Sequence, residues 1–73
     1  MTWLAIDLRA GEGIPLHDHA HGQLIYSAQG IIQVEGQRNA WIVPPERAVW
    51  VPPELPHRIG NRAAAQLRTL YVS

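Results

Sequence analysis

Short apolar runs alternate along the chain with glycine and proline. The breaks recur at close intervals, a pattern typical of many short β-strands. No stretch keeps the spacing of an amphipathic helix over ten residues; Arg62 to Leu70 comes nearest, and we interpret its Ala63–Ala65 segment as a turn or loop. The expected strands are residues 3–8, 16–21, 23–27, 31–35, 39–43, 48–51, 57–59 and 66–72.

About eight short strands separated by turns predict an all-β fold, either a sandwich or a small barrel. The sequence contains no internal repeat, linker or low-complexity tract, so we expect residues 1–73 to form one domain. The proline pairs Pro44-Pro45 and Pro52-Pro53 end strands, because proline cannot donate to a β-ladder. With Pro56 they should fix the turn that precedes His57.

Two of the expected strands, 41–43 and 49–51, carry apolar residues on both faces. Either both faces are covered within the domain, or one outer face pairs with a second subunit. A chain of 73 residues has little spare segment to cover a sheet, which favours a homodimer. The chain also stops directly after the apolar segment Leu70-Tyr71-Val72, so we expect the natural protein to continue past Ser73.

Composition and charge argue against a nucleic-acid surface, a disulfide framework and a membrane helix. Six acidic and six basic residues cancel, and the arginines are scattered, which argues against a nucleic-acid surface on this chain. There is no cysteine and hence no disulfide framework. No apolar run approaches the roughly 20 residues that a membrane helix needs. We therefore expect a cytoplasmic protein with no membrane partner.

The four histidines are the clearest candidates for chemistry, and three of them stand at His17, His19 and His21. Alternate side chains of a strand share a face, so neighbouring pairs can converge on one metal ion. His57 follows the proline-rich turn and could arrive from a facing strand, and Gln23 would share the face of His19. The histidines taken alone leave a second interpretation open, in which they line a polar pocket without metal.

The spacing of these residues resembles the two motifs of the cupin family. Gly11 is followed by five residues, His17-x-His19, three residues, Gln23, six residues and Gly30. The first motif has this spacing, with glutamate where this chain has Gln23. The second motif reads glycine, five residues, Pro-x-Gly, two residues, histidine, three residues, asparagine. In this chain Pro52, His57 and Asn61 match the proline, histidine and asparagine of that motif. Glu46 and Glu54 stand in place of its two glycines. The resemblance implies a double-stranded β-helix, the cupin jelly roll.

Residues 21–30, 41–53 and 56–58 also resemble the N-terminal domain of AraC-type transcription regulators. In that group a cupin senses a small-molecule effector or mediates dimerisation, and a C-terminal pair of helix-turn-helix motifs binds DNA. Nothing in this sequence resembles those helices. The resemblance therefore implies a sensor domain that contacts DNA only through a C-terminal domain outside this chain.

The cupin resemblance also implies a metal site, with His17, His19, His57 and, with a weaker donor, Gln23 as ligands. The ion would be divalent (Zn, Ni, Fe or Mn). An amide oxygen is a weak neutral ligand, so the charge of the ion would be less compensated than beside a carboxylate.

Three further residues are candidates for ligand binding: Tyr26, His21 and Trp41. Tyr26 is expected on the strand face of Leu24, where it either lines the pocket or packs as a core aromatic residue. We find no catalytic residue, because the glutamates lie in turns or beside prolines. A binding module is thus favoured over the alternative, a small metal-dependent cupin enzyme such as a dioxygenase or isomerase.

Overall fold

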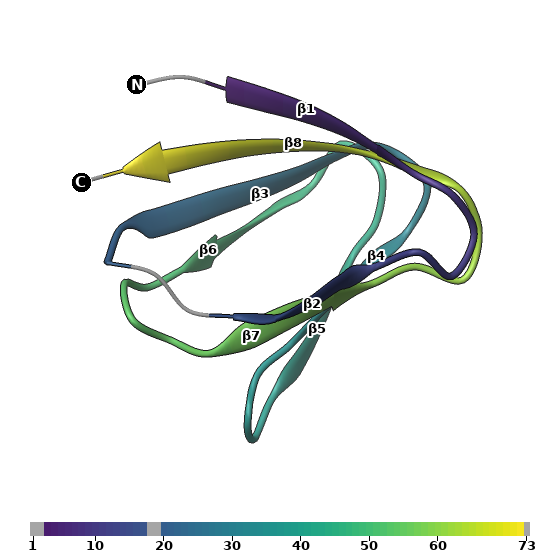
Figure 1. Cartoon of the computed structure of the whole chain (residues 1–73). Helices are drawn as coiled ribbons and strands as arrows, with labels where there is room; N and C mark the ends of the chain where they lie inside the picture. The colour runs from purple at the N-terminus through teal and green to yellow at the C-terminus, as the bar shows by residue number, and fades with distance from the viewer. Residues whose placement is uncertain (1–2, 18–19, 73) are drawn as a thin grey trace.

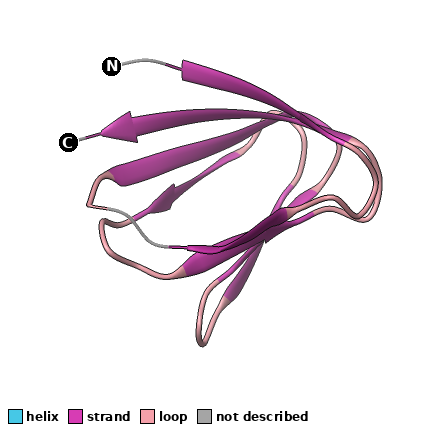
Figure 2. Ribbon diagram, viewed as in Figure 1, coloured by secondary structure: helices cyan, strands magenta, loops and turns pink. Residues whose placement is uncertain are grey.

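The computed structural model describes residues 3–17 and 20–72, with the side chain of His17 left out, and every regular element in this part is a β-strand (Figures 1 and 2). The all-β prediction is confirmed, and most strands lie close to the expected positions. The strand expected over residues 16–21 instead covers Ile14–His17, so His21 lies in a bend and not on the strand of His17. Ala63 and Ala64 lie in the turn before the last strand, as expected for a segment too short for a helix. The strands are β1 (Trp3–Leu8), β2 (Ile14–His17), β3 (Gly22–Gln29), β4 (Ile32–Glu35), β5 (Ala40–Val43), β6 (Ala48–Val51), β7 (His57–Gly60) and β8 (Ala65–Val72).

The strands form two four-stranded antiparallel sheets that pack face to face (Figure 1). The first sheet has the order β1-β8-β3-β6 and the second the order β2-β7-β4-β5. Apart from the β4–β5 hairpin, neighbours within each sheet are not consecutive in sequence, so the chain crosses repeatedly from one sheet to the other. This is the double-stranded β-helix that the motif spacing predicted.

The core lies between the two sheets and consists of alternate side chains from both. Ile25 and Leu67 from the first sheet and Ile32 and Val34 from the second are fully buried. Leu8, Val43, Val51, Ile59 and Ala65 complete the buried apolar set. Burying these side chains supplies most of the driving force for folding, since the described residues hold no cysteine that could add a cross-link.

The outward faces of the two sheets differ in chemistry. On the first sheet, Trp3 lies opposite Leu70, Leu70 opposite Leu24, and Leu24 opposite Trp50, so one apolar row crosses all four strands. We call these four residues the outer apolar row. On the second sheet, Glu35 lies opposite Arg58, and their side chains form an ion pair of 3.1 Å. The first sheet thus presents a continuous apolar row, whereas the second combines an ion pair with separate exposed apolar side chains such as Ile42.

The two ends of the space between the sheets are closed differently (Figure 1). The β1–β2 and β7–β8 connections run side by side at one end, and the β6–β7 connection and both termini lie at the other. None of the described residues belongs to a helix that is long and apolar enough to cross a membrane.

Candidate functional site

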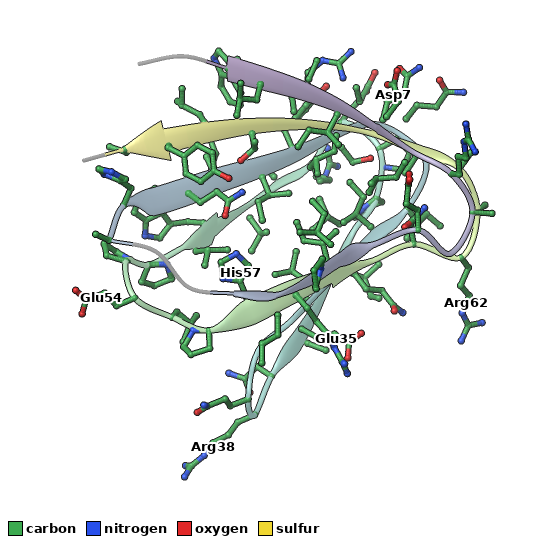
Figure 3. The ribbon with its side chains drawn as sticks, in the orientation of Figure 1. Asp7, Glu35, Arg38, Glu54, His57 and Arg62 are labelled. Atoms are coloured by element: carbon green, nitrogen blue, oxygen red, sulfur yellow. The ribbon has the colours of Figure 1, made fainter. Side chains whose placement is uncertain are left out.

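The candidate site is centred on His57, which begins β7 and points into the space between the sheets (Figure 3). Its side chain is completely buried. The ring atom Nδ1 lies 2.8 Å from the carbonyl oxygen of Leu55 in the preceding turn. A carbonyl can only accept, so Nδ1 carries a proton and the other ring nitrogen, Nε2, is directed into the interior.

Gln23 reaches the same point from β3 on the opposite sheet. Its amide Oε1 lies 3.1 Å from His57 Nε2, and its Nε2 donates to the Thr69 hydroxyl at 2.7 Å. Gln23 is 2% exposed and Thr69 is fully buried on β8. His57, Gln23 and Thr69 therefore form a hydrogen-bonded chain across the interior, which we call the interior polar cluster.

The proton on His57 and the orientation of the Gln23 amide depend on each other. With Oε1 facing the ring, His57 Nε2 must donate, and because Nδ1 also donates the ring is an imidazolium. A neutral ring instead requires the amide nitrogen on its side, and the Thr69 hydroxyl then donates to Oε1. Both arrangements keep the contacts from imidazole to amide and from amide to hydroxyl.

The structure brings two of the four predicted metal ligands, His57 and Gln23, into direct contact. The backbone of His17 lies opposite that of His57 in the β2–β7 pairing, as expected if the two histidines serve one site. The side chain of His17 and the whole of His19 fall outside the described residues. His21 is exposed in the turn before β3.

The donor set fits a divalent ion in one respect. The Leu55 carbonyl holds the Nδ1 proton, which is how proteins commonly present the other imidazole nitrogen to a metal. The described residues add only the neutral amide of Gln23, and they contain no group of three histidine, cysteine, aspartate or glutamate side chains placed to hold an ion. A metal at this site would thus depend on His17 and His19.

Two of the predicted ligand-binding residues lie away from the cluster. Tyr26 is on the face of Leu24, as expected, but that face is the outer one; with Trp3 and Arg68 it lines a hollow of about 330 Å³ on the first sheet. The structure therefore does not bring Tyr26 into the interior, because the buried side chains that alternate inward on β3 are Gln23, Ile25 and Ser27. Trp41 lies on β5 opposite Val34 and packs partly against the core.

The sequence analysis missed Thr69 and Tyr71, which share the inward face of β8. Thr69 completes the polar cluster, and half-buried Tyr71 lies opposite Gln23 in the β3–β8 pairing. The available signal was the alternation of Leu67, Thr69 and Tyr71 in the last strand, because a buried hydroxyl at the centre of such a run needs a polar partner.

The asparagine and the two replaced glycines of the second motif have structural roles. Asn61 accepts from the Gly13 amide at 2.9 Å and donates to the carbonyls of Arg9 and Ala63, joining the β1–β2 and β7–β8 connections. Glu46 and Glu54 have φ angles of 66° and 63°. Both glutamates therefore occupy left-handed backbone positions where glycine is favoured, which explains why the motif has glycine there.

A curated transcription regulator is similar in sequence to this chain. The chain is 38% identical over 58 residues to the HTH-type transcriptional regulator NimR of Escherichia coli K12. The match covers 80% of this chain and 21% of NimR, so the chain spans about a fifth of that relative.

Solved structures share the fold. SPY1581 of Streptococcus pyogenes, a conserved protein of unknown function, superposes with a TM-score of 0.92 at 17% identity over 97% of this chain and 62% of its own. The cupin domain of Cnp3 from Schizosaccharomyces pombe gives 0.88 at 18% identity, covering 97% and 54%. The iron(II) form of HppE gives 0.81 at 17%, covering 94% and 41%. A family model described as the cupin domain matches residues 5–73, and with both motifs and the jelly-roll topology in place, the chain belongs to the cupin family.

Proposed function

We propose that this cupin is the effector-sensing and dimerising domain of an AraC-type transcription regulator. The observation that supports this most is the 38% identity to a transcriptional regulator over 80% of the chain. DNA would be bound by a C-terminal helix-turn-helix domain beyond Ser73, and the regulator would act in the cytoplasm. The gene sequence tests this directly: two helix-turn-helix motifs are expected after Ser73, and a stop codon at that point would count against the proposal.

The effector would bind at the interior polar cluster. The cluster offers a hydroxyl, an amide and an imidazole to a small polar molecule, and half-buried Tyr71 lies beside it. Such a ligand can change the arrangement of a DNA-binding partner only by binding two arrangements with different affinity. His21 is retained in this proposal as a ligand contact, whereas Trp41 lies away from the cluster and Tyr26 belongs to the outer face.

The chemistry of the buried residues supports binding rather than catalysis. Among the described residues, the buried polar side chains are amides, hydroxyls and one imidazole, and none is a carboxylate that could act as a general base. A thermal-shift screen of small polar metabolites should find a compound that raises Tm in the wild type and raises it less in Thr69→Val. Turnover of that compound would instead support the metal-dependent enzyme, and no stabilising compound would indicate a purely dimerising domain.

We further propose that His57 Nε2, together with His17, His19 and Gln23, binds a divalent ion (Zn, Ni, Fe or Mn). Metal analysis of protein purified without affinity resin should find an ion in the wild type and a background level in His57→Ala. Background levels in both proteins would leave the histidines as the lining of the effector pocket.

We also propose that a second copy of the chain covers the outer apolar row. Trp3 is 51% exposed there, and with Tyr26 and Arg68 it forms a hollow of the composition that protein interfaces favour. Sedimentation velocity should show a dimer that Trp3→Glu dissociates. Ile42→Glu is the matched control, because Ile42 is 59% exposed on the outer face of the other sheet. A dimer that survives Trp3→Glu would contradict this surface.

A further inference from the structure

A groove separate from the interior polar cluster lies beside the β4–β5 hairpin. Its volume is about 410 Å³. It lies where the second sheet ends in β5 and the first sheet ends in β6, so its walls come from both sheets. The residues that line it are Gly36, Gln37, Arg38, Asn39, Trp41, Trp50, Pro52 and Leu55.

Two indole rings from different sheets form the apolar part of this hairpin groove. Trp41 on β5 is half-buried against the core, and Trp50 on β6 is 49% exposed. The Trp50 ring lies directly over Gly22, where an added Cβ would overlap it. Glycine at position 22 therefore allows Trp50 to lie flat on the sheet edge, which fixes one wall of the groove before any ligand arrives.

The outer end of the hairpin groove is cationic. Arg38 stands at the tip of the hairpin and extends outward (Figure 3), and the turn beneath it is closed by a 2.8 Å bond from the Gly36 amide to the Asn39 carbonyl. None of the described residues that line the groove is acidic. The ion pair seen among the described residues is that of Arg58 with Glu35, and it does not involve Arg38. The guanidinium of Arg38 can therefore pair with an anionic ligand.

We propose that the hairpin groove binds a small planar aromatic carboxylate. Indole faces and a proline ring favour a flat apolar body, while a guanidinium binds a carboxylate through two parallel hydrogen bonds. The amides of Gln37 and Asn39 flank Arg38 and add donors for the same anion. None of His57, Gln23 and Thr69 lines this groove, so the proposal does not require an effector in the interior; its Trp50 also belongs to the outer apolar row.

The test is a titration of the ¹⁵N-labelled chain with 2-naphthoate, followed through the three indole N–H signals. The signals of Trp41 and Trp50 should shift saturably, and that of Trp3, on the far edge of the first sheet, should not. Arg38→Gln should weaken binding by about threefold to tenfold, the range for a charge-assisted contact at an exposed site. The uncharged analogue 2-naphthamide should bind the wild type as weakly as naphthoate binds Arg38→Gln.

Two further variants keep the result interpretable. Arg62→Gln, an exposed arginine in the β7–β8 connection, should leave the affinity unchanged. Trp50→Ala should weaken binding about tenfold by removing one stacking face. Absence of saturable shifts, or equal affinity in wild type and Arg38→Gln, would overturn the proposal. Affinity that falls in Thr69→Val but not in Arg38→Gln would place the ligand in the interior and also overturn it, without affecting the proposed effector site.

Discussion

His57 and Asn61 lie at the two ends of β7, and both are buried polar residues, but their partners differ in kind. Asn61 bonds only to backbone groups in the contacts described: the Gly13 amide and the carbonyls of Arg9 and Ala63. His57 bonds to one carbonyl and then to a chain of side chains, Gln23 and Thr69. Backbone partners are held in place by the strands and turns, whereas side chains can change rotamer, so we expect the end at Asn61 to be more rigid than the end at His57.

The largest loss of stability should come from removing the Asn61 side chain. Asn61→Ala removes three hydrogen bonds and leaves the Gly13 amide and two carbonyls without that partner, which should lower the free energy of unfolding by about 3 kcal/mol. Urea unfolding measures this directly. The interior polar cluster should keep its ligand affinity in the folded variant. A loss below about 1 kcal/mol would show that the two connections are held by other contacts.

At the His57 end of the barrel, a negative charge at position 23 should strengthen metal binding. Gln23→Glu places a carboxylate beside His57 Nε2 and should tighten Ni²⁺ or Zn²⁺ binding at least about tenfold, equivalent to about 1.4 kcal/mol, because the ion's charge is then better compensated. Isothermal titration calorimetry provides the measurement. Gln66→Glu makes the same exchange at an exposed position of β8 and should change nothing. Equal affinities in the wild type and Gln23→Glu would remove Gln23 from the proposed metal site.

A smaller loss of stability is expected when the Thr69 hydroxyl is removed from the interior polar cluster. Thr69→Val deletes the hydroxyl that Gln23 contacts but keeps the shape of the side chain, and should lower the free energy of unfolding by about 1 kcal/mol. The ¹⁵N signals of the His57 ring should shift as well, because the Gln23 amide loses the partner that orients it. Thr69→Ser keeps a hydroxyl and should preserve those signals. An unchanged ring spectrum in Thr69→Val would mean that Thr69 does not orient the amide.

The smallest effect concerns the two Pro-Pro-Glu turns, one at each end. Glu46 lies in a turn closed by a bond from the Arg47 amide to the Pro44 carbonyl, and Glu54 lies in the turn before His57. Glu46→Gly and Glu54→Gly should each stabilise the chain by about 0.5 kcal/mol, since relief of the positive φ slightly exceeds the entropy cost of glycine. Thermal unfolding checks this, and Glu54→Ala, which keeps the Cβ, should gain nothing. A larger gain in stability for Glu54→Gly than for Glu46→Gly would show that the turn before His57 carries the greater backbone strain.

Much of the fold could be predicted from the sequence because the turns are marked by glycine and proline and the strands by short apolar runs. The interior face was harder to predict. On β3 the inward side chains are Gln23, Ile25 and Ser27, two of them polar, whereas Leu24 and Tyr26 point outward, so the inward face is not the more apolar one. Periodicity places Tyr26 and Leu24 on one face, but it does not say which face is inside when the interior holds a polar site.

The partly polar inward face also explains the missed residues. Thr69 and Tyr71 stand in an apolar terminal strand with no motif around them, and their role depends on pairing with β3, more than forty positions earlier in the chain. By contrast, His57 and Gln23 could be found from the sequence, because motif spacing fixes them and a proline turn precedes His57. Long-range register is the information that spacing alone does not supply.

Leu55 belongs to both compartments of the molecule. Its side chain lines the hairpin groove, while its carbonyl oxygen holds the ring proton of His57. A molecule that pressed on that side chain and turned its peptide plane would move the carbonyl that orients the imidazole inside the barrel. By thermodynamic reciprocity, a ligand bound inside the barrel would then change affinity in the groove by the same factor as a ligand in the groove changes affinity inside.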